Sequence, residues 1–315
     1  MSQLSTYKAP NQKKKKTWFH SLWKFSRPHT IIGTSLSILA LYLIALATFK
    51  ISPTVENMGT LLGALAACWC GNIYIVGLNQ LEDVEIDKIN KPNLPLAAGD
   101  FSLTQGKVII ATTGILALLI SGLLGIYLWA TVAISLAIGT AYSLPPIRLK
   151  RFPFWAAFCI FTVRGVIVNL GIFLHFSQKF TSQELLPPTV WALTLFIVIF
   201  TVAIAIFKDV PDMEGDREYN ITTFTILLGK PAIFNLSRWV ITVCYLVMIA
   251  LGFVWLSEVN LAFLIISHLG LLVLLWWRSQ KVDLDSKAEI ASFYQFIWKL
   301  FFWEYLLFPV ACLIG

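Results

Sequence analysis

The sequence predicts an all-α integral membrane protein, with nine transmembrane helices in a bundle around an internal cavity. Of the 315 residues, 57% are apolar and 13% are charged, whereas soluble domains carry roughly 25% charged residues. The mean hydropathy is +0.75. The apolar residues form long unbroken runs, not the alternating segments of about ten residues typical of a membrane β-barrel. Composition therefore excludes soluble globular, disordered and fibrous proteins.

Nine segments are long enough to cross a bilayer, which takes about 20 apolar residues. The third and fourth are joined near Tyr127 and Leu128, and we expect a break there because one continuous span would be too long. The first apolar run is too long for a signal peptide, so we expect no cleavage after Ala47. The predicted spans are residues 30–49, 58–79, 107–126, 128–144, 153–176, 188–207, 232–256, 259–277 and 293–313.

Lysine and arginine residues are unevenly distributed between the two sides of these spans. They crowd the N-terminal tail and the loops on its side, whereas the opposite side has only Lys50 and Lys179. The positive-inside rule therefore predicts a cytoplasmic N-terminus. We expect a basic cytoplasmic tail, residues 1–28, and one nine-helix domain, residues 29–315. Because topology accounts for most of the net charge of +7, we infer neither nucleic acid nor an obligate protein partner.

The cysteines and histidines do not form a recognisable metal site. All five cysteines lie inside apolar runs, and Cys68-x-Cys70 has no second pair or nearby histidine to complete a zinc site. We interpret the cysteines as small buried hydrophobic residues. We interpret His29, His175 and His268 as structural.

An acidic cluster follows the second predicted span. Asn79, Asp83 and Asp87 are spaced four residues apart, so they share one face of a continued helix. Like charges at this spacing destabilise a helix by a few tenths of a kcal/mol each, and by more in the lower dielectric near a membrane. We therefore expect nearby cations. The alternative interpretation is a solvated acidic loop, paired with residues such as Lys88 and Lys91.

A second acidic cluster follows the sixth predicted span. Asp209, Asp212 and Asp216 also fit one helical face, although Pro211 can distort the backbone there. The second and third of these acids each follow an aspartate of the first cluster by 129 residues. Both clusters end a span on the same side of the membrane, which predicts two related halves. The predicted halves are about residues 29–150 and 151–280, followed by a ninth helix.

Two facing carboxylate clusters suit a hard divalent cation, which prefers oxygen ligands. Mg²⁺ in particular uses one or two carboxylates and shares phosphate oxygens with its substrate. Basic residues lie on the same face, because Arg148, Lys150 and Arg151 follow the fourth span beside Tyr142, and Arg27 precedes the first. This combination predicts a diphosphate site with Mg²⁺ bridges, on the cytoplasmic side. The alternative for the basic residues is topology signalling alone.

Arg164 is the one basic residue inside a predicted span, where a charge is costly. It has two interpretations: a structural hydrogen bond across helices, or the binding of an anionic group in a cavity. Asn72 and Asn169 are further polar residues within spans.

The two acidic motifs resemble those of the UbiA superfamily of intramembrane aromatic prenyltransferases. Asn79-x3-Asp83-x3-Asp87 resembles its first Asp-rich signature, and Asp212-x3-Asp216 resembles the second. Within the superfamily, longer runs are most similar to the homogentisate phytyltransferases of cyanobacteria and plastids, and homogentisate solanesyltransferases look similar too. These runs are residues 25–30, 77–81, 87–96, 207–217 and 290–300.

The resemblance implies Mg²⁺-dependent transfer of a phytyl group from phytyl diphosphate to homogentisate with loss of CO₂. The implied product is 2-methyl-6-phytylbenzoquinol, for tocopherol synthesis in a plasma or thylakoid membrane. It also implies a dry, aromatic-walled cavity around an allylic carbocation. For the metals, the resemblance implies one Mg²⁺ at Asn79, Asp83 and Asp87 and another at Asp212 and Asp216, with a metal or acceptor role for Asp209. For the substrates, it implies that the diphosphate binds at Tyr142, Arg148, Lys150 and Lys208. It implies that the acceptor carboxylate binds at Arg27 and Arg164.

Two alternatives stay open. The donor can instead be solanesyl or geranylgeranyl diphosphate, or the acceptor another aromatic acid, because periodicity does not determine tunnel length. From another class, acidic residues in a membrane protein also occur in secondary transporters and cation channels. Transporters place ligands near the bilayer midplane, whereas these acids lie at span ends. Detergent-purified protein separates the enzyme from the transporter, because an enzyme forms product in micelles whereas transport is observed only between two compartments.

Overall fold

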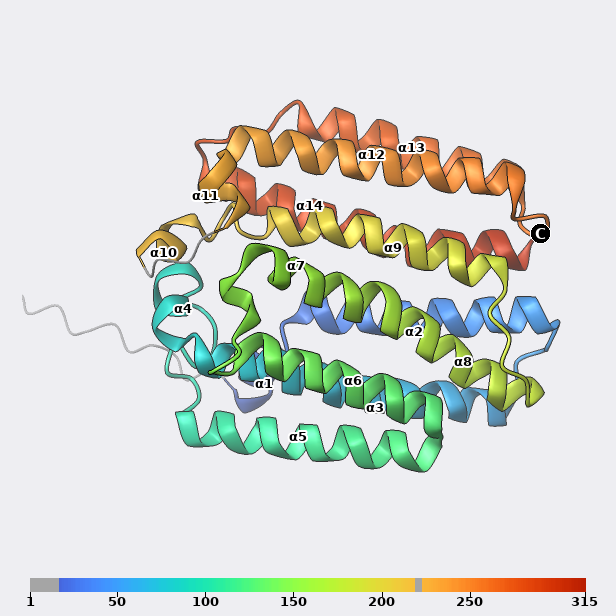
Figure 1. Cartoon of the computed structure of the whole chain (residues 1–315), viewed down its shortest axis with the longest axis horizontal. Helices are drawn as coiled ribbons and strands as arrows, with labels where there is room; N and C mark the ends of the chain where they lie inside the picture. Colours follow the sequence, from blue (N-terminus) through green and yellow to red (C-terminus); the bar gives the residue numbers. More distant parts are fainter. Residues whose placement is uncertain (1–16, 219–222) are drawn as a thin grey trace, which may run out of the picture.

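The computed structural model describes residues 17–218 and 223–315, without the side chains of residues 214–216. Every regular element in this part of the chain is helical, and nine stretches of it are long and apolar enough to span a membrane, as predicted (Figure 1). The spans are α2 (Pro28–Phe49), α3 (Val55–Glu82), α5 (Leu103–Leu124), α6 (Ile126–Ser143), the composite α7 (Pro153–Phe161), η2 (Thr162–Ile167) and α8 (Val168–Thr181), then α9 (Pro188–Phe207), α12 (Lys230–Val254), α13 (Leu261–Ser279) and α14 (Lys287–Leu313).

The break between the third and fourth spans lies slightly earlier than predicted. Helix α5 ends at Leu124, and Gly125 adopts a φ of 144° before α6 begins. Glycine reaches this backbone conformation without steric cost because it has no Cβ. The predicted position near Tyr127 was wrong by two residues, because the apolar pattern does not mark a turn that one glycine makes. The two helices nevertheless form separate spans.

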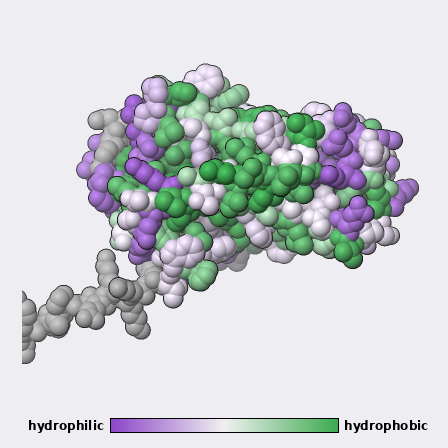
Figure 2. All heavy atoms as spheres, turned by 90° about the horizontal axis from the view of Figure 1, so that it is seen from below, coloured by the Kyte–Doolittle hydropathy of each residue, from purple (hydrophilic) through white to green (hydrophobic). Residues whose placement is uncertain are grey.

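The long helices lie side by side along one axis, and the short helices gather at one end (Figure 1). This end holds the ends of α3 and α9, where both acidic clusters begin. Hydrophilic residues cover the two ends of the molecule, and hydrophobic residues dominate the middle (Figure 2). A hydrophobic band between two hydrophilic ends matches the hydrocarbon core and the two polar surfaces of a bilayer. The short helices are α1 (Trp18–Phe25), α4 (Val84–Asn90), η1 (Leu149–Arg151), α10 (Met213–Glu218) and α11 (Phe224–Leu228).

Helix α9 is the most buried of the nine described spans, and 72% of the residues in its apolar stretch are buried inside the protein. It packs against α12, α14 and the α7–η2 segment. Its Phe200 ring lies 5.6 Å from that of Phe301, and its Phe207 ring lies 5.7 Å from that of Phe293. Such aromatic packing makes α9 a rigid support for the residues that follow it.

Helix α1 precedes the first span and is anchored to α3. A Cβ on Gly77 would lie 2.7 Å from two ring carbons of Phe25, so only glycine leaves room for this ring. The Gln80 side-chain amide donates to the Phe25 carbonyl at 2.7 Å. This packing fixes the backbone just before Arg27, close to the end of α3.

Candidate functional site

The first acidic motif lies where α3 passes into α4. Asp83 ends α3 and precedes α4, so the predicted single continued helix is interrupted there. The spacing of four residues is nevertheless kept, because the Asp83 and Asp87 amides donate to the Asn79 and Asp83 carbonyls at 3.1 and 2.7 Å. The Asn79 side-chain amide donates to Asp83 Oδ2 at 3.1 Å. Asn79, Asp83 and Asp87 therefore stay on one side of the junction.

The second acidic motif is not the helical face that the spacing predicts. Helix α9 ends at Phe207, and residues 208–212 form turns before α10 begins. Pro211 accounts for the end of the helix, because it lacks an N–H and disfavours α conformation in the preceding residue. The single-face prediction for Asp209, Asp212 and Asp216 was therefore wrong. The Asp216 side chain lies outside the described residues.

Two motifs that are far apart in the sequence meet through α4 and α10, which pack against each other. Lys91, just after α4, forms an ion pair with Asp212 just before α10. From the sequence, Lys91 is expected only as a partner within a solvated acidic loop. No spacing in the sequence indicates that this lysine connects the two motifs, because the contact depends on how the two loops fold back.

The carboxylates of the site are already compensated by cations. Asp83 accepts hydrogen bonds from Arg148 Nη2 at 3.1 Å and Lys150 Nζ at 2.6 Å, and all three side chains are largely buried. Lys208 Nζ lies 2.6 Å from Asp209 Oδ1. Burial lowers the pKa of Lys208, but Asp209, Tyr142 and Asp212 together outweigh burial, so this pKa lies well above its ordinary value. Lys208 therefore carries a positive charge at the site.

Two arginines reach the first motif from strained backbone positions. Arg27 has a φ of 51° and Arg148 a φ of 40°, in the left-handed region that non-glycine residues rarely adopt. Arg27 Nη2 donates to Asn79 Oδ1 at 3.0 Å, and Arg148 donates to Asp83. Strained residues of this kind cluster at functional sites. The structure therefore brings both predicted arginines to the first acidic motif.

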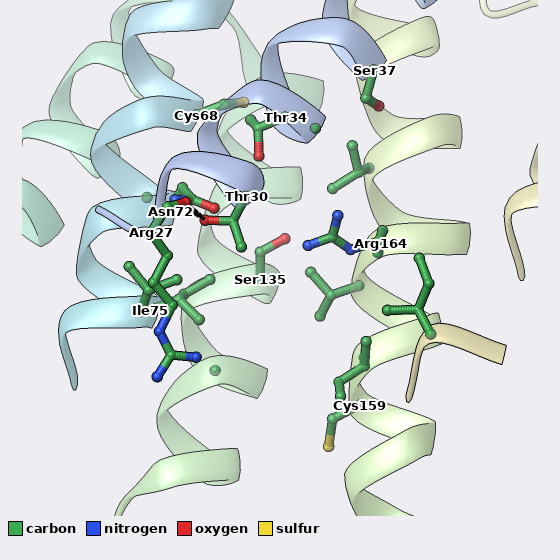
Figure 3. A pocket seen from close by; sticks show the side chains of 18 of the residues that line it. Arg27, Thr30, Thr34, Ser37, Cys68, Asn72, Ile75, Ser135, Cys159 and Arg164 are labelled. Atoms are coloured by element: carbon green, nitrogen blue, oxygen red, sulfur yellow. Dashed lines mark hydrogen bonds between the residues drawn. The ribbon is translucent and has the colours of Figure 1, made fainter. Parts of the chain in front are cut away.

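A cavity of about 290 Å³ extends from this end of the bundle into its interior. Arg27, Asn79, Tyr142 and Lys208 line it, which places the predicted residues from four segments around one space. Farther along, the Arg164 side chain points into the cavity opposite Ser135 and Thr30 (Figure 3). The remaining walls are mainly apolar and aromatic. Arg164 therefore lies in the same cavity as the polar residues near the acidic motifs.

Arg164 has no ion-pair partner within the part of the chain that the structure describes. Its guanidinium lies over the rings of Trp298 and Phe301, at 4.8 and 5.7 Å from their centroids. It belongs to η2, a π-helical segment within the fifth span, and such segments are frequent at functional sites. Stacking on aromatic rings offsets part of the cost of a buried charge. An unpaired cation in a cavity is suited to attract an anionic group.

The donor set around the acidic motifs fits a hard divalent cation. Among the described residues, no group of three or more His, Cys, Asp or Glu side chains converges on one point. The motif does contain oxygen donors, however, and the buried Asp87 Oδ2 has no hydrogen-bond partner in the described part of the chain. Burial raises the pKa of Asp87 to about 6, although Arg27 and Lys91 oppose the shift. A buried carboxylate with a free oxygen is a suitable ligand for Mg²⁺.

Asp87→Asn is expected to raise the unfolding temperature of the metal-free protein at pH 8. The raised pKa means that the folded protein binds this proton more tightly than the unfolded chain does, so stability is lost as the pH rises through about 6. Asparagine is neutral at every pH. Thermal unfolding in detergent with a chelator measures the difference, which is expected to shrink at pH 5. Equal unfolding temperatures at pH 8 would contradict the burial of a charged Asp87.

The model of the UbiA prenyltransferase family matches residues 35–300 of this chain. A homogentisate phytyltransferase from Synechocystis sp. is 57% identical over 292 residues, covering 92% of this chain and 95% of that protein. A chloroplastic homogentisate phytyltransferase 1 from Arabidopsis thaliana is 42% identical, covering 92% of this chain and 74% of that protein. A homogentisate geranylgeranyltransferase from Triticum aestivum is 39% identical, covering 92% and 72%.

A solved structure shares the fold. It is that of a UbiA homologue from Archaeoglobus fulgidus bound to GPP and Mg²⁺, with a TM-score of 0.61 and 15% sequence identity, covering 94% of this chain and all of that one. The likeness confirms the arrangement of the helices.

Proposed function

Because this chain belongs to the UbiA prenyltransferase family, we propose that it transfers a phytyl group from phytyl diphosphate to homogentisate, with loss of CO₂. The observation that carries the proposal is 57% identity to a homogentisate phytyltransferase across nearly the full length of both chains. The cavity supports it, because one space contains cations and oxygen donors at one end and an unpaired arginine farther along. The product would be 2-methyl-6-phytylbenzoquinol.

The donor's diphosphate would bind at the acidic motifs. Asn79, Asp83 and Asp87 would hold one Mg²⁺, and Asp212 and Asp216 the other. Mg²⁺ would supply Lewis acidity that stabilises the departing diphosphate. Since the Asp87 carboxylate has a free buried oxygen, it is the ligand best placed to bind metal without first losing a protein partner.

Basic side chains would stabilise the negative charge that grows on the diphosphate as the carbon–oxygen bond breaks. Arg148 and Lys150 neutralise Asp83, and Lys208 neutralises Asp209. Metal at Asp83 would free Arg148 and Lys150 to contact phosphate oxygens, and Lys208, which lines the cavity, would contact them while it stays paired with Asp209. Metal at Asp212 would likewise free Lys91 to contact a phosphate oxygen. Tyr142 lines the cavity beside Lys208.

The acceptor would bind farther into the cavity, with its carboxylate on Arg164. This guanidinium lacks an ion-pair partner among the described residues, and a carboxylate matches its fork of donors. Arg27 already contacts Asn79, so we assign it to the diphosphate end and not to the acceptor. Aromatic walls such as Trp298 and Phe301 would exclude water and stabilise an allylic cation. Asp209 would remain a partner of Lys208.

We also propose the arrangement in the membrane. The excess of lysine and arginine at the end with the acidic motifs favours a cytoplasmic active site. The equal offset of the two acidic motifs supports two related halves, about residues 29–150 and 151–280, within a single domain of residues 29–315. Helix α1 extends the packed structure into the basic segment of residues 1–28.

Donor selectivity tests the proposed substrate. Purified protein in detergent is given homogentisate with phytyl, geranylgeranyl or solanesyl diphosphate at equal concentrations, and products are quantified by mass spectrometry. We expect the highest kcat/KM with phytyl diphosphate. A higher value with either of the other donors would contradict the phytyl assignment, and turnover without a second compartment would exclude a transporter.

A further inference from the structure

The ring-alkylation step of the proposed reaction releases a proton that some group must accept. The phytyl C1–oxygen bond breaks, and its electron pair leaves with diphosphate. A ring carbon of homogentisate uses a π electron pair of the ring to bond to C1. The electron pair of the C–H bond at that carbon then returns to the ring and restores its aromaticity, which releases the proton. Separately, the carboxylate leaves as CO₂, and the benzylic carbon takes up a proton. The ring proton therefore needs an acceptor in the cavity.

The described residues that line the cavity include one imidazole, that of His29. The other titratable groups there are three cations (Arg27, Arg164 and Lys208), three phenols and two thiols. Arginine and charged lysine have no lone pair to accept a proton, and neutral phenols and thiols are weak acceptors. A neutral imidazole has a ring nitrogen whose lone pair can accept a proton, and histidine is the side chain that most often serves as a general base.

His29 lies between the two charged ends of the proposed site. It follows Arg27, which contacts Asn79 at the diphosphate end, by two residues on the first turn of α2. Its ring lies 4.9 Å from the ring of Trp298 in an edge-to-face arrangement, and Arg164 lies over that same indole at 4.8 Å. A substrate with its carboxylate on Arg164 and its reacting carbon toward the diphosphate would place its aromatic ring beside His29.

We propose that His29 is a catalytic residue that accepts the ring proton after the carbon–carbon bond has formed. This inference rests on the proposed function and adds a base to it. It departs from our interpretation of His29 as structural, which considered only its position at the start of a span. The diphosphate product is the competing proton acceptor, and the experiment distinguishes the two.

His29→Phe keeps an aromatic ring against Trp298 but removes both nitrogens, and His29→Gln is a second variant with a polar side chain. Both are expected to lower kcat for product formation by about 100-fold or more, since general-base catalysis contributes about 10² to 10⁴. With ring-deuterated homogentisate, the variants should show a larger isotope effect on kcat than the wild type, because deprotonation becomes slow. His20→Phe on α1, at an exposed position outside the cavity, is the matched control and should behave as the wild type.

Each outcome separates the two proposals. A wild-type rate in His29→Phe would overturn the catalytic role and leave the proposed function intact, with diphosphate as the proton acceptor. A low rate in both variants without a larger isotope effect would show that His29 only positions the substrate, and would also overturn the proposal. Absence of product in the wild-type protein would overturn the proposed function, and this inference with it.

Discussion

Asp83→Asn and Asp212→Asn are each expected to lower turnover by at least about 100-fold, the effect of removing one element of electrostatic stabilisation. Asparagine preserves side-chain volume but removes the charge that a metal requires. Asp83 also neutralises Arg148 and Lys150, and Asp212 neutralises Lys91, so each substitution leaves cations without a partner. Product formation at saturating substrate concentrations, measured over a range of Mg²⁺ concentrations, provides the rates.

Glu85→Gln is the matched control for these substitutions. Glu85 lies on α4 between Asp83 and Asp87, but its carboxylate is exposed and paired with Lys88. An exposed pair contributes little, so this variant should keep wild-type activity and the same Mg²⁺ dependence. Near-normal turnover in Asp83→Asn and Asp212→Asn would contradict the metal-binding role of both motifs.

Arg164→Met is expected to raise KM for homogentisate by at least about 30-fold, since removing one member of a buried charge pair costs about 2 kcal/mol or more. KM for phytyl diphosphate should change little, because Arg164 is assigned to the acceptor and not to the diphosphate. Methionine retains the packing against Trp298. The metal-free variant should unfold at the same or a higher temperature, since a buried charge without an ion-pair partner among the described residues has been removed.

Arg238→Met provides the control for a lost cation–π contact. Arg238 lies over Trp276 and Phe234, at 4.8 Å from each centroid, and it does not line the cavity. This variant should keep the wild-type KM for both substrates. If Arg164→Met raised KM for the donor as much as for the acceptor, Arg164 would have to be reassigned to the diphosphate.

The sequence was sufficient to predict the nine spans, because a bilayer imposes one length and one polarity on every helix that crosses it. Their count is confirmed among the described residues. The same constraint predicted that both acidic motifs lie at one end of the bundle, where α4 and α10 pack together. Arg27, Tyr142, Arg164 and Lys208 were all selected from the sequence, and all four line the cavity.

Details set by single residues or by tertiary contacts could not be predicted in the same way. Pro211 ends α9, so the second motif lies in turns and not on a helical face. The π-helical segment at Arg164 has no sequence pattern that distinguishes it from an ordinary helix. The pairing of Lys91 with Asp212 depends on the packing of two loops. The placement of His29 beside Trp298 likewise joins the first and last spans.

Mg²⁺-dependent product formation tests the central claim most directly. Isolated membranes containing the protein are incubated with phytyl diphosphate and homogentisate labelled with ¹⁴C either in the ring or in the carboxyl group, with Mg²⁺ or with a chelator. We predict a lipid-extractable product from ring-labelled homogentisate and an equal amount of labelled CO₂ from carboxyl-labelled homogentisate, both lost when Mg²⁺ is removed. No lipid product with Mg²⁺ present, or a product that retains the carboxyl label, would contradict decarboxylating phytyl transfer.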